Sequence, residues 1–184
     1  MLKRLAPPLA IIISFLLDTA ILPVFVYGRY LVPVSLIMVI LIGITLRRMN
    51  GLLYGTIAGL LVDISAGTLG MKLFPYMLIG FLIGFLLDQQ PEISRNLEQR
   101  ERLQLIAVHA IWIFALVLLY EIFLFVYQYF STAIFEWKYV LDLLLRTALV
   151  TALSLVLLPL SRRIFLKRTV HAGKGPATRE VKHF

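Results

Sequence analysis

The chain has 184 residues, of which 60% are apolar and only 15% are charged, and its mean hydropathy is +0.91. Soluble globular proteins contain about 45–50% apolar residues, and a domain of this size has too little interior to hide the excess. The composition therefore excludes a soluble enzyme, a disordered chain and a disulfide-stapled secreted module. The absence of cysteine also excludes thiol catalysis, cysteine-ligated zinc and disulfides.

Long apolar runs along the chain predict transmembrane helices, because unpaired backbone amides are too costly in lipid. About 20 residues cross the hydrocarbon core at a rise of about 1.5 Å each. We predict an all-α integral membrane protein, a bundle of six transmembrane helices at about residues 6–27, 31–46, 51–65, 73–87, 103–129 and 139–165. Residues 1–168 form this membrane domain, and residues 169–184 are predicted to be a flexible, basic cytoplasmic tail.

The placement of the basic residues predicts the orientation of the bundle. Most of the 18 Lys and Arg residues fall in four segments, at about 3–4, 47–48, 95–102 and 162–182, which six alternating spans bring to one side. By the positive-inside rule this side is the cytoplasm, so both termini are predicted to be cytoplasmic. The formal charge of +8 is therefore interpreted as a topology signal, and no nucleic-acid partner is expected.

Aromatic residues gather at the opposite, outer interface of the predicted bundle. They are Tyr27, Tyr30, Tyr127, Tyr129, Trp137 and Tyr139. Amphipathic rings commonly anchor helices at this depth. Anchoring alone and a docking surface for a partner outside the cytoplasm both remain open interpretations.

Glycines follow a four-residue spacing in the third and fourth predicted spans. Gly51, Gly55 and Gly59 share one helix face, and Gly80 and Gly84 repeat the spacing. Such faces let a neighbouring backbone approach closely, either within the bundle or in another protein. Gly67 and Gly70 mark a turn between the two spans.

Ionisable residues inside or near the spans cost about 2.5–3.5 kcal/mol on insertion scales, so they usually pair or face a cavity. They are Asp18, Asp63, Glu121, Asp142 and Arg146. Asp18, Glu121 and Arg146 lie at similar predicted depths, and Asp142 precedes Arg146 by four residues, a favourable order for a helical ion pair. We hypothesise that Arg146 is the cationic centre of an ion-pair group in the outer half of the bundle, with Glu121 or Asp18 as its second partner. The alternative is a local Asp142–Arg146 pair near the head groups with the other acids separate, and a structural role is favoured in both cases.

The sequence contains no motif typical of catalysis. Its three histidines, His109, His171 and His183, do not stand in the spacing of a metalloprotease helix, and neither a serine nucleophile elbow nor a P-loop is present. The predicted loops are too short to build an active site beside the membrane. We therefore expect a protein that is not an enzyme and that uses no metal or cofactor.

The stretch from Phe15 to Leu87 combines several motifs in a distinctive order. An aspartate near the end of the first span is followed by a proline that opens the second, and the glycine-spaced third span ends in G-L-L-x-D before a small turn, L-G and a G-x-x-x-G span. The positions are Asp18, Pro33, Gly51, Gly55, Gly59, Leu60, Leu61, Asp63, Gly67, Leu69, Gly70, Gly80 and Gly84. Over about 40% of the chain this pattern resembles MreD, the family of bacterial rod shape-determining membrane proteins. One departure is Val34, where the family often has an aspartate, and this puts any role of that acid in doubt.

The resemblance implies a function that the residues alone do not give. It implies a scaffold of the cell-elongation machinery in the bacterial cytoplasmic membrane, surrounded by membrane lipids. Its partners would be an MreC-like protein with a single span and, indirectly, an MreB-like actin homologue and a peptidoglycan polymerase and transpeptidase. The resemblance also implies a fold similar to the six-helix substrate-binding subunits of energy-coupling-factor transporters.

The rival interpretation is a substrate-binding membrane subunit of a vitamin transporter. Ala6 and Ala10 stand at the spacing of the alanine contact in such subunits, but Pro7 and Pro8 lie between them, so the match is poor. Such a subunit also needs an outer pocket lined by polar and aromatic groups, which the acids and Arg146 would supply. An unrelated lipid-handling protein is a third, weaker alternative.

Overall fold

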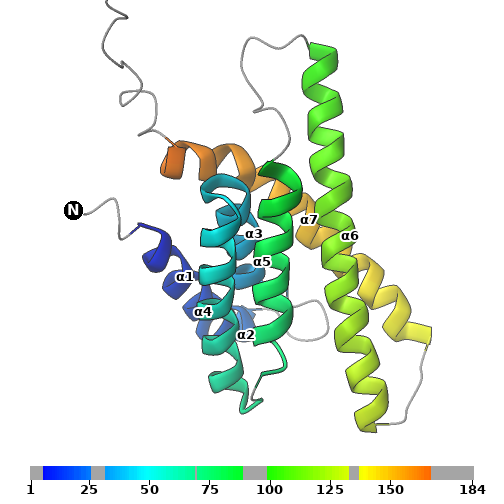
Figure 1. The fold of residues 1–184 in the computed structure, drawn as a ribbon. Helices are drawn as coiled ribbons and strands as arrows, with labels where there is room; N and C mark the ends of the chain where they lie inside the picture. Colours follow the sequence, from blue (N-terminus) through cyan, green and yellow to red (C-terminus); the bar gives the residue numbers. More distant parts are fainter. Residues whose placement is uncertain (1–5, 26–31, 69, 89–98, 133–136, 167–184) are drawn as a thin grey trace, which may run out of the picture.

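The computed structural model describes residues 6–25, 32–68, 70–88, 99–132 and 137–166, and all its regular elements in these ranges are helices (Figure 1). They are α1 (Ala6–Leu16), the π-helical segment η2 (Leu17–Ile21), α2 (Leu22–Phe25), α3 (Val34–Leu46), α4 (Arg48–Ala66), α5 (Leu73–Asp88), α6 (Gln99–Thr132) and α7 (Trp137–Leu166). Each of the six predicted spans corresponds to a helical stretch, and α1, η2 and α2 form the first without a break. The predicted tail 169–184, Tyr27, Tyr30 and Leu69 lie outside the described residues.

The helices are those of a membrane protein. The stretches Arg48–Ala66, Gln104–Phe130 and Lys138–Arg162 are long and apolar enough to cross a bilayer. Ala6–Ile21, Val34–Leu46 and Leu73–Leu87 are shorter apolar helices. At a rise of about 1.5 Å per residue, the 34 residues of α6 extend for about 50 Å, which exceeds the hydrocarbon core of about 30 Å. The predicted fifth span, residues 103–129, is therefore only the central part of a longer helix.

α3 occupies the centre of the bundle, where it contacts α1, α4, α5 and α7. Leu36, Val39, Ile40 and Ile42 on this helix are fully buried. A helix that is apolar on every side is typical of such a position, because no face of it needs to reach water. A single residue, Arg47, separates α3 from α4, so the two helices form a very tight hairpin.

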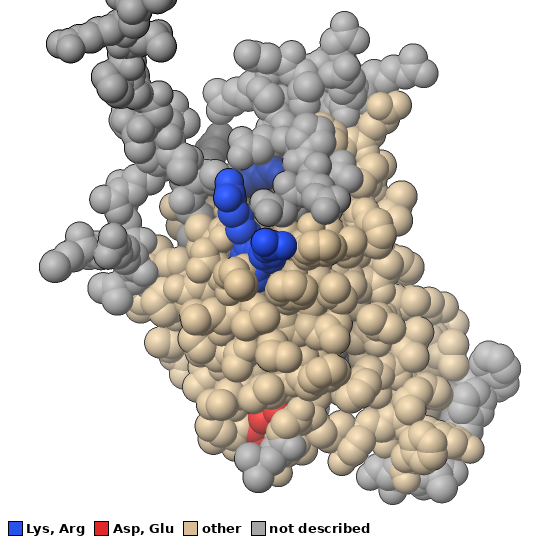
Figure 2. Space-filling view, viewed as in Figure 1, with Lys and Arg blue, Asp and Glu red and all other residues tan. Residues whose placement is uncertain are grey.

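Two further hairpins follow along the chain, α4–α5 and α6–α7. α4 and α5 lie side by side along their length, and α6 stands at one side of the bundle and projects beyond it at the end where it begins (Figure 1). α7 crosses obliquely behind the other helices and contacts α3 and α6. Figure 2 shows Lys and Arg side chains gathered toward one end of this face and acidic atoms near the opposite end.

Candidate functional site

The glycines of α4 and α5 bring two helix backbones into direct contact. A Cβ atom at Gly55 would lie 2.5 Å from a backbone oxygen of α5, and one at Gly59 would lie 2.6 Å from a Cα atom of α5. Gly51 on α4 and Gly80 on α5 face each other in the same way, and Gly84 meets the first turn of α4. The four-residue spacing left open whether these faces pack within the bundle or against another protein. In the structure they pack within the bundle.

Gly67 and Gly70 shape the turn after α4 and do not belong to a packing face. Their φ angles are +67° and +86°, in the left-handed region that L side chains rarely adopt, and a Cβ atom on either would have open space around it. Gly67 caps α4 by donating its N–H to the carbonyl oxygens of Asp63 and Ile64. This arrangement is common at helix C-termini and reverses the chain toward α5.

Asp63, at the end of α4, holds the beginning of α5. Its carboxylate accepts hydrogen bonds from the N–H groups of Lys72 and Leu73, both at 2.9 Å, and from the hydroxyl of Thr68 at 3.1 Å. The side chain is buried, and the first amides of a helix have no partner within the helix. Asp63 therefore acts as an N-cap supplied by the neighbouring helix, and the helix dipole of α5 favours its negative charge.

Asp18 caps the beginning of α3 in the same way as Asp63 caps α5. Its two oxygens accept the N–H groups of Val34 at 2.7 Å and Ser35 at 2.8 Å. Asp18 lies in η2, where the N–H of Leu22 bonds to the oxygen of Leu17 five residues earlier. Such π-helical turns are rare and often occur at functional sites. Asp18 is thus engaged with α3.

Glu121 on α6 is the acid that the structure places opposite Arg146 on α7. Oε2 of Glu121 lies 3.6 Å from Nη1 of Arg146. The Glu121 side chain is only 5% exposed, and its other oxygen, Oε1, is buried without a hydrogen-bond partner. Of the two partners that the sequence hypothesis offered to Arg146, the structure brings Glu121 to it and directs Asp18 elsewhere.

A polar pocket of about 290 Å³ is lined by residues of all six helical stretches and of the α4–α5 turn. The charged and polar side chains that line it are Asp18, Thr19, Ser35, Ser65, Lys72, Tyr76, Tyr120, Glu121 and Arg146. They come from η2, α3, α4, the turn before α5, α5 itself, α6 and α7. Segments far apart in the sequence thus supply both signs of charge to one pocket of a largely apolar bundle.

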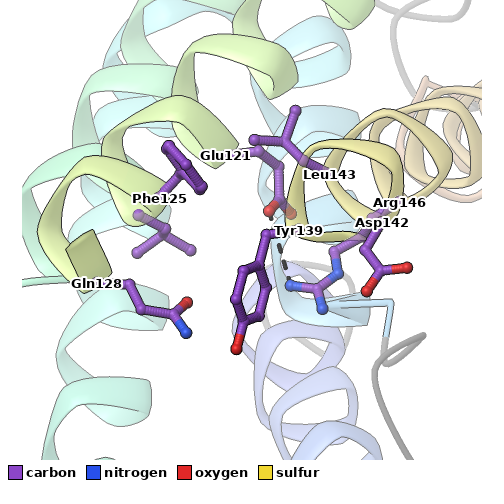
Figure 3. A pocket seen from close by; sticks show the side chains of 8 residues that line it. Glu121, Phe125, Gln128, Tyr139, Asp142, Leu143 and Arg146 are labelled. Carbon is purple, nitrogen blue, oxygen red and sulfur yellow. Dashed lines mark ion pairs between the residues drawn. The ribbon is translucent and has the colours of Figure 1, made fainter. Parts of the chain in front are cut away.

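A second pocket of about 270 Å³ lies between α6 and α7 and is shown in Figure 3. It shares Glu121, Leu124 and Arg146 with the polar pocket. In Figure 3 Glu121 and Arg146 point toward each other, Asp142 lies beside Arg146, and Tyr139 faces the same space. Asp142 therefore belongs to the same region as Arg146, whereas Asp63 lies apart from it at the α5 cap.

The sequence hypothesis missed several polar residues of this pocket, among them Lys72, Ser35, Tyr76 and Tyr120. The hydroxyls of Ser35 and Tyr76 lie 3.1 Å apart, and the rings of Tyr76 and Tyr120 meet edge to face with centroids 5.7 Å apart. Lys72 carried the one usable signal, because it lies two residues after Gly70, in the turn that leads into α5. The tyrosines sit inside apolar runs and look like ordinary core residues.

The polar pocket presents hydrogen-bond acceptors and cationic donors side by side. Within the described ranges, His, Asp and Glu do not gather in threes that would hold a metal ion. His109 is buried on α6, where its Nδ1 lies 2.7 Å from the carbonyl oxygen of Leu105. Glu121 Oε1 offers an acceptor and Lys72 and Arg146 offer cationic donors, so the pocket suits a polar group that carries both a donor and an anionic acceptor.

Comparison with known proteins gives one match. A family model described as rod shape-determining protein MreD matches residues 2–158, which is most of the chain. No curated protein and no solved structure matches. The match extends over the α6–α7 hairpin, beyond the stretch 15–87 whose motifs carried the resemblance in the sequence.

Proposed function

The chain belongs to the MreD family of rod shape-determining proteins, and from this premise we propose that it is a non-enzymatic membrane scaffold of the bacterial cell-elongation machinery. It binds an MreC-like partner, and through that partner it connects an MreB-like actin homologue to the peptidoglycan polymerase and transpeptidase. It lies in the cytoplasmic membrane with six spans and both ends in the cytoplasm. The segregation of the basic segments supports this orientation.

An apolar groove between α5 and α6 supports the partner proposal. It has a volume of about 340 Å³ and is lined by apolar and aromatic side chains. Phe74 and Leu78 on α5 and Leu119, Phe123 and Val126 on α6 form most of its walls. A concave apolar groove on a membrane helix pair is the shape into which one further apolar helix packs, because association in lipid depends on close van der Waals contact.

The glycine faces, which are suited to close packing, are already filled. The glycine faces of α4 and α5 lie against each other, so they leave no room for a partner helix. The exposed apolar residues of α4, such as Leu53 and Leu60, belong to a helix face that lines no described pocket. The groove is therefore the surface that best accommodates the single span of an MreC-like protein, and it is the observation that carries this proposal.

Site-specific photo-crosslinking in cells tests this docking. A photoreactive residue at Leu119 or Phe123 is expected to crosslink to the span of the MreC-like partner. Leu53 and Leu60 on α4 are matched controls, since Leu119 and Leu53 are 51% and 52% exposed and Phe123 and Leu60 are 41% and 43% exposed. Crosslinks from α4 alone would place the partner on another face and leave the scaffold role intact. Failure of any MreC-like protein to co-purify in mild detergent would contradict the partner itself.

A second candidate function, a substrate-binding subunit of a vitamin transporter, is favoured by one observation, the polar pocket. Its tyrosines and charged side chains are the type of lining that a small polar solute requires. Purification in mild detergent separates the two functions. A bound vitamin together with an ATPase module would indicate the transporter, and an MreC-like protein would indicate the scaffold.

A further inference from the structure

The polar pocket contains a buried acceptor that no group of the described chain satisfies. Glu121 Oε1 has no hydrogen-bond partner among the described residues, although the Glu121 side chain is only 5% exposed. An unsatisfied buried carboxylate oxygen costs more than an ordinary lost hydrogen bond, because the group has given up water without a replacement. The pocket therefore lacks a strong donor at this point, and a charged N–H donor suits it best.

The same pocket also carries cationic side chains. Lys72 is half-buried at the α4–α5 turn, and Arg146 lies on the other side of Glu121. Asp18 adds a second negative charge, and its position is fixed because both its oxygens accept backbone amides. A ligand with one ammonium and one anionic group would meet both signs of charge and add no net charge to a site of low dielectric.

An adjoining lateral pocket indicates that this ligand is an amphiphile. The lateral pocket has a volume of about 310 Å³ and is largely apolar, with Met71 and Tyr127 among its lining residues. It shares Lys72 and Leu124 with the polar pocket. A free solute needs only the polar pocket, whereas a lipid fills both, with its head group in the first and the start of its chains in the second.

We propose that the polar pocket binds the phosphoethanolamine head group of a membrane phospholipid. The primary ammonium donates to Oε1 of Glu121, the phosphodiester lies between Lys72 and Arg146, and the glycerol end leads into the lateral pocket. A choline head group lacks N–H donors and leaves Glu121 unsatisfied. A glycerol head group offers only neutral hydroxyls, which make weaker hydrogen bonds to a carboxylate than an ammonium does. This proposal does not depend on the partner docked in the apolar groove.

Native mass spectrometry of the purified protein tests this site with phosphatidylethanolamine, phosphatidylcholine and phosphatidylglycerol of identical chains. A charge-assisted hydrogen bond corresponds to about tenfold in affinity, so wild type is expected to retain phosphatidylethanolamine about tenfold better than phosphatidylcholine. Glu121→Gln, which keeps the shape and removes the charge, is expected to reduce this preference to about twofold or less. Lys72→Gln is expected to weaken all three lipids, and Lys138→Gln, at an exposed lysine on α7, serves as its matched control.

Three results of the comparison among lipids and variants would overturn the proposal. They are equal retention of phosphatidylethanolamine and phosphatidylcholine by wild type, an unchanged preference in Glu121→Gln, and no difference between Lys72→Gln and Lys138→Gln. Soluble glycerophosphoethanolamine is the fourth arm. If it binds as tightly as the lipid, the ligand is a solute and the lipid assignment is wrong. If Glu121→Gln does not fold, the lipid comparison in wild type and in Lys72→Gln decides.

Discussion

The hairpins α4–α5 and α6–α7 each carry a carboxylate on the first helix that serves the second, but they use it differently. In α4–α5, Asp63 accepts backbone amides at the start of α5, and the glycine faces bring the two backbones together. In α6–α7, Glu121 faces the side chain of Arg146, and pockets remain around the pair. An amide partner is fixed by the helix itself, whereas two long side chains hold the helices apart and leave space for a ligand.

The capping of backbone amides by a carboxylate, seen in the α4–α5 hairpin, is the structural arrangement of the two. α3 follows the same rule as α5, since Asp18 caps it through the amides of Val34 and Ser35. The departure from the family pattern at Val34 does not affect this bond, because only the backbone N–H of that residue takes part. The region α1–α5 is thus closed by backbone-directed caps and glycine contacts, and the pockets lie where it meets α6 and α7.

The largest effect is expected from filling the glycine contact. Gly55→Leu and Gly59→Leu each place side-chain atoms where the α5 backbone lies, so α4 and α5 must separate. Overpacking typically costs about 1–3 kcal/mol, and a clash with backbone belongs at or above the upper end of this range. Thermal unfolding in detergent should show a large loss of stability or no folded protein. Leu60→Phe adds bulk on the exposed face of α4 and should behave as wild type; an equal loss there would contradict the comparison.

Charge reversal in the α6–α7 hairpin is expected to have a smaller effect that can be rescued. Arg146→Glu places two acids together, and contacting residues commonly couple by about 0.5–3 kcal/mol. The double variant Glu121→Arg with Arg146→Glu should recover much of the stability measured by thermal unfolding. Combining Arg146→Glu with Asp18→Arg should give no recovery, because it removes the cap of α3. Rescue by Asp18 instead of Glu121 would reverse the assignment made here.

Removing the Asp63 cap of α5 tests the α4–α5 hairpin without adding side-chain volume. Asp63→Ala leaves the amides of Lys72 and Leu73 without their acceptor, and loss of an N-cap typically costs about 0.5–2 kcal/mol. We expect a loss of about 2 kcal/mol by equilibrium unfolding, because the site is buried. Asp63→Asn keeps an acceptor oxygen and should lose less than half as much. An Asp63→Ala protein as stable as wild type would show that α5 does not need this cap.

Local patterns in the sequence were sufficient to predict the helices and the glycine contact. Largely apolar stretches mark α3, α4 and α5, which have 13, 19 and 16 residues. A four-residue glycine spacing fixes one helix face whatever the rest of the chain does. The similar depths of Glu121 and Arg146 also brought the correct pair into consideration. These features depend only on residues within one helix or on simple counting along two helices.

The caps and the pockets required information that is not local. Asp18 reaches α3 across 16 residues and through a π-helical turn, so neither its depth nor its neighbours indicated an amide partner. The polar pocket is assembled from segments between Asp18 and Arg146, and Lys72 and Tyr76 enter it only because α5 is packed against α4. The ion-pair hypothesis included Asp18 because it compared only depths along the helices. Depth does not show that the Asp18 carboxylate bonds to the amides of α3.

The smallest effect is expected at the α3–α4 junction and has the opposite sign. Arg47 has φ 73° and ψ 169°, a conformation that is essentially confined to glycine and costs other residues about 1–3 kcal/mol. Arg47→Gly is therefore expected to stabilise the protein by about 1 kcal/mol, after the greater flexibility of glycine in the unfolded chain offsets part of the gain. Arg48→Gly is the matched control, since it removes the same side chain from the first position of α4 and should destabilise by up to about 1 kcal/mol. Opposite shifts of the two unfolding temperatures would show that the tightly packed half of the molecule still stores strain at one residue. A loss of stability in Arg47→Gly would mean that the arginine side chain holds this junction more strongly than its backbone opposes it.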